Sequence, residues 1–249
     1  MKSIDLNCDM GESFGNYTVG QDELLMPYLT SCNIACGFHG GDPYHIERTI
    51  DHALAHGLRI GAHPSYPDLQ GFGRRKMMVP PSELSSLIKY QVGAIKAMVE
   101  SKGGNLSYVK PHGALYNSLA HDTNEAEVVI RAVKEIDSTL KIMLLAGSPA
   151  IDVAKEHGIN VIQEAFADRR YVSSTALMSR SISGSVIADV ASAVHQVLSI
   201  VERKRIKCSD DIEYPLHAES ICIHGDHTNA VVIAQGVHEE LSRRNLLQK

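Results

Sequence analysis

DLNCDMGE (residues 5–12) joins an apolar strand to a polar cluster. We expect the strand at 4–8, and the alternation of side chains along a strand places Asp5, Asn7 and Asp9 on one side of it. In parallel β/α folds, functional groups gather where the strands end. The segment therefore predicts a buried strand that leads into part of an active site.

Short apolar runs of this kind alternate with longer helical patterns along the whole chain. The six further expected strands are 33–36, 59–62, 106–109, 141–145, 160–162 and 220–223. The main expected helices are 42–57, 82–102, 122–137, 148–158, 186–204 and 230–244. Repeated β-α units imply a parallel sheet with right-handed crossovers. Seven units favour an α/β fold of the seven-stranded parallel barrel type over a two-half Rossmann sheet, although an open sheet stays compatible with the pattern.

Composition restricts the class of protein. No Gly/Ser/Pro-rich linker divides residues 1–249, so we expect a single domain. The formal charge of −5 gives no electrostatic reason to bind nucleic acid or an anionic membrane. No apolar run approaches the roughly 20 residues that cross a bilayer, and the start MKSIDLNCDM lacks the apolar part of a signal peptide. Five cysteines are too few and odd in number for a disulfide framework, which favours a cytoplasmic location.

Cys32 and Cys36 are the only closely spaced cysteine pair. Their spacing is not C-x-x-C and no second pair accompanies them, so we expect small buried hydrophobic residues rather than a zinc ribbon.

Polar clusters follow most of the expected strands. They lie at 5–12, 37–42, 61–76, 110–113, 164–170 and 224–227. Four histidines in these clusters, each close to a strand end and next to Gly or Pro, are expected to converge at one end of the barrel: His39, His63, His112 and His224. By contrast, His45, His52 and His56 form a stripe on one helix without the central Glu of H-E-x-x-H, and we expect that stripe to be solvated.

These residue types suit acid–base chemistry, metal binding or the binding of an anion. The candidate catalytic residues are Asp9, Glu12, His39, His63, His112, His224 and Asp226. The candidate substrate-binding residues are Asn7, Arg74, Lys110, Glu164, Asp168 and Arg169. Histidines from three strands could hold a catalytic zinc, and the residues alone leave the presence of a metal open. The sequence contains no G-x-x-x-x-G-K-[ST] loop, no G-x-S-x-G elbow and no evident cysteine nucleophile motif, so acid–base or metal-assisted chemistry is favoured.

Seven stretches of the chain, in this order, resemble the LamB/YcsF family. They are DLNCDMGESFG (5–15), NIACGFHGGDP (33–43), GAHPSYPDLQGFGRR (61–75), YQVGAI (90–95), VKPHGALYN (109–117), EAFADRRY (164–171) and ICIHGDH (221–227). Chance agreement of seven separated motifs is negligible. The resemblance implies a seven-stranded β/α barrel related to the glycoside hydrolase/deacetylase barrels.

The resemblance also implies a function. Members of this family are described as the A subunit of bacterial ATP-dependent 5-oxoprolinase, which opens 5-oxo-L-proline to L-glutamate together with subunits B and C. ATP, with Mg, would then be handled by the partners, and no intrinsic cofactor is expected on this chain. A homo-oligomer is also compatible with the sequence. We expect Asp9, Glu12 and the strand-end histidines to position and activate water, with Lys110 or Arg169 holding a substrate carboxylate or a phosphate.

The chain departs from the family pattern in three places. Ser174 and Thr175 stand where the family usually has an Asp-Gly turn, so the 172–180 loop is expected to turn differently. Residues 227–229 replace a common Thr-Pro-Gly, and Gly40 replaces a usual alanine. The core polar residues are intact, so activity is still expected.

Two other functions compete with this one. The first is a free-standing metal-dependent hydrolase, like the carbohydrate deacetylases that share the barrel; stoichiometric zinc and activity without ATP would favour it. The second is a binding subunit that delivers substrate while chemistry occurs elsewhere; substitutions in its polar clusters should change KM and spare kcat.

Overall fold

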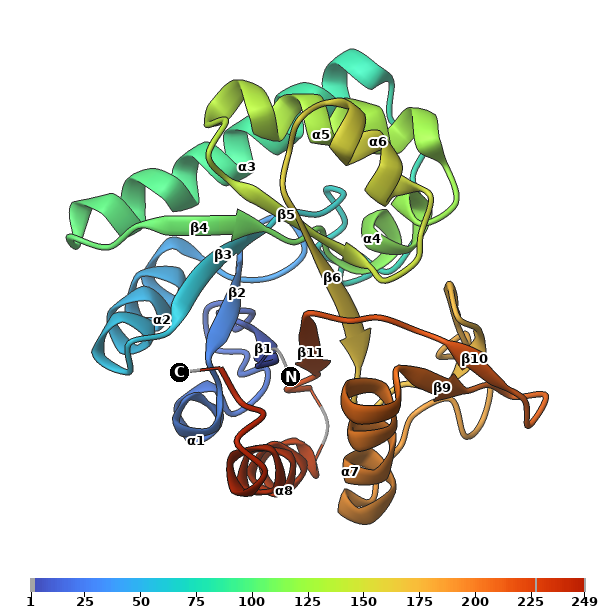
Figure 1. Ribbon diagram of the computed structural model, residues 1–249. Helices are drawn as coiled ribbons and strands as arrows, with labels where there is room; N and C mark the ends of the chain where they lie inside the picture. The colour runs from blue at the N-terminus through green and yellow to red at the C-terminus, as the bar shows by residue number, and fades with distance from the viewer. Residues whose placement is uncertain (1–2, 227, 249) are drawn as a thin grey trace.

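Seven parallel strands close into a barrel in the computed structural model, which describes residues 3–226 and 228–248 (Figure 1). The barrel strands are β1 (Asp5–Met10), β2 (Ser31–Ala35), β3 (Arg59–His63), β4 (Leu106–Val109), β5 (Lys141–Leu145), β6 (Val161–Phe166) and β11 (Ser220–Ile223). Their order around the barrel is β1-β11-β6-β5-β4-β3-β2. Most of their residues are buried, as expected for parallel strands covered on both faces. The predicted seven-stranded α/β barrel is confirmed.

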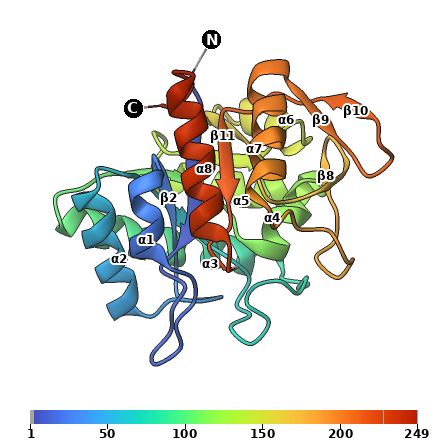
Figure 2. The same ribbon diagram turned by 90° about the horizontal axis from the view of Figure 1, so that it is seen from below.

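Helices surround the barrel on the outside (Figures 1 and 2). They are α1 (Asp22–Leu25), α2 (Pro43–Ala55), α3 (Pro81–Ser101), α4 (Gly113–Leu119), α5 (Thr123–Ile136), α6 (Ala150–Glu156), α7 (Val190–Leu198) and α8 (Ala230–Arg243), with short turns η1 (Met26–Tyr28) and η2 (Ser199–Arg203). The predicted start of α2 is confirmed: Asp42 caps the helix by accepting from the backbone N–H groups of Tyr44 and His45, and Pro43 occupies the first turn.

Several elements differ from the prediction. Strands β1 and β6 extend further than expected, so that Asp9 and Glu164 lie within strands and not after them. The helix α4 and two hairpins, β7 (Tyr171–Ser173) with β8 (Ala176–Leu177) and β9 (Arg205–Lys207) with β10 (Glu213–Pro215), were not expected. These elements are too short to produce a clear hydrophobic period.

The barrel interior contains layers of polar side chains. At the amino-terminal end of the strands, Asp5 accepts from the Ser31 hydroxyl at 2.9 Å and pairs with Arg59 at 2.6 Å. One layer higher, Asn7 contacts Glu164 at 3.0 Å and Asn33 at 2.7 Å. Asp9 follows in the next layer, so the three alternate residues of β1 share one side, as predicted.

Tyr108 fills part of this interior because its neighbour on β3 is a glycine. A Cβ atom at Gly61 would lie 2.2 Å from the Tyr108 ring. The Tyr108 hydroxyl lies 2.7 Å from the side-chain oxygen of Asn33 and 3.0 Å from the carbonyl of Cys32. The glycine therefore allows an aromatic side chain to cross from β4 toward β2.

The two ends of the described chain lie side by side (Figures 1 and 2). The Ile4 N–H donates to the Leu246 carbonyl at 2.7 Å, and the Gln248 N–H donates to the Ile4 carbonyl at 2.8 Å. All five cysteines are free and buried, including Cys32 and Cys36. Among the described residues, none of the helices combines the length and the hydropathy that a membrane crossing requires.

Candidate active site

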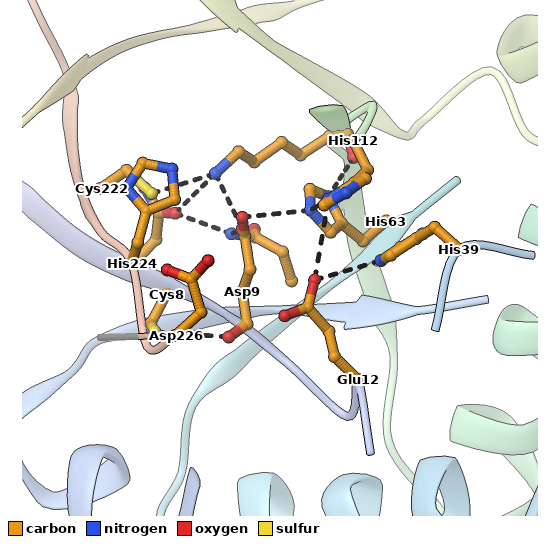
Figure 3. A network of polar contacts seen from close by, with 12 residues as sticks. Cys8, Asp9, Glu12, His39, His63, His112, Cys222, His224 and Asp226 are labelled. Atoms are coloured by element: carbon orange, nitrogen blue, oxygen red, sulfur yellow. Dashed lines mark hydrogen bonds and ion pairs between the residues drawn. The ribbon is translucent and has the colours of Figure 1, made fainter. Parts of the chain in front are cut away.

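Three of the four strand-end histidines meet at the carboxyl end of the barrel (Figure 3). His39 lies in the loop after β2, His63 is the last residue of β3, and His112 follows β4. The His39 and His112 rings are stacked, with centroids 3.7 Å apart and planes at 3°. Nε2 of His63 lies 2.9 Å from Nδ1 of His112. The predicted convergence is therefore seen for these three residues.

Backbone carbonyls fix the orientation of two of these rings. Nδ1–H of His63 donates to the Lys110 carbonyl at 2.6 Å. Nε2–H of His112 donates to the Phe72 carbonyl at 2.9 Å. A carbonyl oxygen can only accept, so each contact locates one ring proton and leaves the other nitrogen facing the centre of the cluster.

Two carboxylates complete the cluster. Asp9 Oδ2 lies 3.2 Å from Nε2 of His63, and Glu12 Oε1 lies 3.1 Å from Nε2 of His39. Burial would raise the pKa of Asp9, but the charges of His63 and Lys110 lower it well below its usual range. Burial and the Asp9 charge raise the pKa of Glu12 to about 8. Burial also lowers the pKa of His39 and His112, so these rings favour the neutral form.

Lys110 connects the cluster to the barrel interior. Its ammonium group lies 2.9 Å from Asp9 and 2.9 Å from Glu164, and 3.2 Å from the Cys222 sulfur. Burial would lower its pKa, but the Asp9 and Glu164 charges raise it well above the usual value. The lysine is therefore charged and fully engaged by carboxylates, which makes it a poor binding group for a substrate anion.

His224 lies on the opposite side of the cluster, beside Cys222 (Figure 3). Its Nδ1 lies 2.9 Å from Asp168 Oδ1, and its backbone N–H donates to Asp168 Oδ2 at 2.9 Å. The ring stacks on Phe166 with centroids 5.5 Å apart. His224 therefore forms a separate His–Asp pair and does not join the other three histidines.

A cavity of about 480 Å³ lies at the strand ends and is lined by residues of both groups. Asp9, His63, His112 and His224 line it, together with a set of arginines: Arg74, Arg169 and Arg180. Burial and the neighbouring Arg180 charge lower the pKa of Arg169 to about 10, which still leaves it charged at neutral pH.

The arginines differ in how fully they are paired. Asp226 lies 2.5 Å from Arg74 and 3.5 Å from Arg180. Arg169 donates to the Met178 carbonyl at 2.7 Å, and its buried Nε has no hydrogen-bond partner among the described residues. Arg169 is therefore the arginine best placed to accept an anionic group.

The remaining predicted residues take other positions. Asn7 and Glu164 are fully buried below the cavity and do not line it, and Asp168 is held behind His224. Glu12 and His39 are also buried behind the cavity wall. His227, in the last of the quoted motifs, lies outside the described residues.

Some cavity residues were not predicted as site residues. They are Tyr116, Asn117, His121, Phe166 and Arg180. Three of them lie on or just after α4, a seven-residue helix that gave no sequence signal. Arg180 follows the β7–β8 hairpin, and only its place in the family pattern could have indicated it.

A closed parallel barrel with titratable groups at the carboxyl ends of its strands is the architecture of β/α-barrel enzymes. The sequence model of the LamB/YcsF family matches residues 4–248, and the chain belongs to this family. It is 46% identical over 244 residues to a Bordetella parapertussis protein named as the A subunit of 5-oxoprolinase, covering 98% of this chain and 97% of that one. A Geobacillus thermodenitrificans protein of the same name is 45% identical over 246 residues, covering 99% and 96%.

Solved structures share this fold. A crystal structure titled as a lactam utilization protein from Thermus thermophilus superposes with a TM-score of 0.93 at 39% identity, covering 100% of this chain and 99% of that one. A putative cellobiose-phosphate cleavage protein from Enterococcus faecalis superposes with a TM-score of 0.55 at 15% identity, covering 100% and 97%. The second likeness concerns the fold alone.

Proposed function

We propose that this chain is the A subunit of an ATP-dependent 5-oxoprolinase, which opens the lactam of 5-oxo-L-proline to L-glutamate together with subunits B and C. The observation that carries the proposal is the buried cluster of Asp9, His63 and His112, which faces a cavity with arginines at its mouth. The names of relatives at 45–46% identity support the choice of substrate. The reaction consumes ATP, which agrees with the cytoplasmic location predicted for this chain.

The chemistry explains why partners are needed. A five-membered lactam is an unstrained amide, and opening it to glutamate is unfavourable unless it is coupled to ATP cleavage. Overall, the lactam, ATP and two waters give glutamate, ADP and phosphate. Because this chain has no G-x-x-x-x-G-K-[ST] loop, we assign phosphorylation of the lactam oxygen to the partner subunits and handling of the activated ring to the barrel.

The cavity is lined by several groups that can act on such a ring. The cluster of Asp9, Glu12 and the three histidines positions and activates the water that attacks the phosphorylated ring carbon. Opening of the ring leaves an acyl phosphate, which the second water hydrolyses to glutamate and phosphate. When the C–N bond breaks, the leaving nitrogen must gain a proton, and His224, which is held by Asp168 and lines the same cavity, is our choice of donor. Separate acid and base groups suit a reaction that moves protons at two atoms.

Arg169 is our choice for the substrate carboxylate or the phosphate. Lys110, the other candidate, is already engaged by two buried carboxylates. The planar guanidinium of Arg169 can bind an anion in a bidentate manner. Arg180 and Arg74 add positive charge at the same mouth.

The test is an assay of glutamate formation from 5-oxoproline and ATP, with and without subunits B and C. We expect activity only in the mixture, and we expect His63→Ala, His112→Ala and Asp226→Ala each to abolish it while the far-UV circular dichroism stays unchanged. His52→Ala, on the outside of α2, is the matched control and should keep full activity. Near-normal turnover in all three variants would refute the proposal.

Two other outcomes would replace it. Hydrolysis by the chain alone, without ATP, would indicate a free-standing hydrolase. A raised KM with an unchanged kcat in the three variants would indicate a subunit that only binds substrate.

A further inference from the structure

We propose that Glu12, His39, His63 and His112 together bind one divalent transition-metal ion, with zinc as the preferred ion. Their ligand atoms, one from each residue, all lie within 4.8 Å of one another. The inference stands on the geometry of these side chains and does not depend on which reaction the barrel catalyses.

The ring protons of His63 and His112 point away from the centre of the cluster. Nδ1 of His63 and Nε2 of His112 carry their protons because each faces a backbone carbonyl oxygen. The remaining ring nitrogens, His63 Nε2 and His112 Nδ1, then face each other at 2.9 Å. Two nitrogen lone pairs at this distance repel unless a proton or a metal cation lies between them. Histidines that bind metals usually donate their other N–H to a carbonyl or carboxylate, as both rings do here.

The spacing of the ligand atoms in the cluster also fits a metal site. A tetrahedral zinc site with bonds of about 2.0–2.1 Å has ligand atoms roughly 3.3 Å apart. The corresponding distances are 2.9 Å between His63 and His112, 3.1 Å between Glu12 and His39, and 3.7 Å between Glu12 and His112. They lie on both sides of the ideal value, so small side-chain movements would centre an ion.

The donor set identifies the kind of ion. Three imidazole nitrogens and one carboxylate oxygen suit zinc and similar transition metals, whereas magnesium and calcium prefer oxygen ligands. The buried Glu12 carboxylate would also be stabilised by a cation in direct contact with it. When bound, such an ion polarises a carbonyl group or lowers the pKa of a bound water.

The backbone around the cluster is built to support these ligands. Phe72, whose carbonyl accepts from His112, has a φ of 54°, a conformation that costs energy for a residue other than glycine. A Cβ atom at the next residue, Gly73, would lie 2.7 Å from the His112 ring and 2.8 Å from the His39 Cβ. The strained loop therefore presses directly against two of the four ligands and aims its carbonyl at one of them.

The other candidate group, Asp9, Cys222 and His224, is a weaker metal site. Its ligand atoms are also close together, but the Lys110 ammonium lies 2.9 Å from Asp9 and 3.2 Å from Cys222. This charge would repel a metal cation. We therefore assign the ion to the first group and leave Asp9 beside it as a proton acceptor.

The three histidine ligands differ in how firmly hydrogen bonds hold their rings. The rings of His63 and His112 are held by carbonyls, whereas Nδ1 of His39 has no hydrogen-bond partner among the described residues. We therefore expect His39 to contribute least to the affinity.

The experiment uses the intact chain without substrate, ATP or partners. The protein is stripped with a chelator, dialysed and titrated with zinc, and then with cobalt, whose visible absorption reports a site of low coordination number. We expect one zinc or cobalt per chain. His63→Ala, His112→Ala and Glu12→Gln should each weaken zinc binding by at least about 100-fold, and His39→Ala by less.

The controls are His224→Ala, from the second candidate group, and His52→Ala, on the outside of α2; both should keep the zinc affinity of the parent chain. Circular dichroism checks that each variant is folded. Absence of stoichiometric binding, or equal affinity in the His63, His112 and Glu12 variants, would overturn the proposal. Loss of binding in His224→Ala alone would move the ion to the other group. None of these readouts depends on 5-oxoprolinase activity.

Discussion

Lys110 shows how single residues serve the core and the site together. It is only 2% exposed, and its ammonium group lies between the carboxylates of Asp9 and Glu164. An unpaired charge in the barrel interior would cost several kcal/mol, and the two carboxylates offset that cost. The lysine therefore keeps Asp9 ionised and ordered next to His63.

We predict that Lys110→Met lowers the free energy of unfolding by about 3–5 kcal/mol, because it leaves two buried carboxylates without their cation. Urea unfolding followed by circular dichroism measures the change. The double variant Lys110→Met/Glu164→Gln should recover part of the loss, since one of the two charges is removed. Lys155→Met is the control, because Lys155 and its partner Asp152 are exposed and the pair contributes at most about 1 kcal/mol. An unchanged stability of Lys110→Met would contradict this account.

Site residues could be predicted where the chain places them directly at strand ends. His39, His63 and His112 fulfil this condition, and they converge. His224 also follows a strand, but its ring pairs with Asp168 and does not meet the other three, and this difference depends on barrel geometry that a linear pattern does not contain. His121 and Arg180 reach the cavity from segments with no periodic signal, and their place at the cavity follows from the folded structure.

The start of α2 illustrates how an element is fixed by one side chain. Asp42 accepts hydrogen bonds from the backbone N–H groups of Gly15, Tyr44 and His45 at 2.7–3.1 Å. These bonds, with the one from Gly15 contributing most, lower its pKa from 3.8 to about 2. The same carboxylate thus caps a helix and anchors the loop after β1.

We predict that Asp42→Ala lowers the free energy of unfolding by about 1 kcal/mol at pH 7. The folded-state pKa is depressed, so the stabilisation is complete above the unfolded pKa of 3.8 and is lost as the pH falls toward 2. The difference between the variant and the parent chain should therefore shrink between about pH 4 and pH 2 in urea titrations. Asp51→Ala, on the same helix but in no cap, is the control. If the difference in the free energy of unfolding between the variant and the parent chain grew on acidification, the Asp42 cap would not be the cause of the stabilisation.

Secondary-structure elements, like site residues, could be predicted only where the sequence carries a clear pattern. Barrel strands and long helices were predictable because their apolar residues repeat over enough positions. The β7–β8 and β9–β10 hairpins have strands of two or three residues, and contacts with neighbouring segments determine them. The end of the helix expected at 186–204 is a π-turn that closes at Lys204 with a φ of 54°, which hydrophobic periodicity does not report.

At the scale of the whole molecule, the barrel is closed by contacts between the two ends of the sequence. Strand β1 pairs in parallel with β11, and Ile4 bonds to Leu246 and Gln248. The polar layer around Asn7 and Tyr108 also links strands from both halves of the chain. Neither half can therefore complete a barrel without the other.

We predict that the chain unfolds in one cooperative transition, because closure of the barrel needs both ends of the sequence. The protein has nine tyrosines and no tryptophan, so tyrosine fluorescence reports the environment of buried residues such as Tyr66, Tyr108 and Tyr171. Urea curves from fluorescence and from far-UV circular dichroism should coincide within error. Separate midpoints for the two signals would show that part of the barrel unfolds by itself.

The location of Asp9, Lys110 and Glu164 limits how this protein can evolve a new reaction. Many β/α barrels acquire new reactions by exchanging their loops. Here Asp9 and Glu164 lie within strands, and Lys110 directly follows one, so their replacement would alter the interior of the barrel as well as the chemistry. Laboratory evolution that varies only the 172–180 loop should therefore shift which anion enters the cavity, whereas a new reaction would require rebuilding the barrel core.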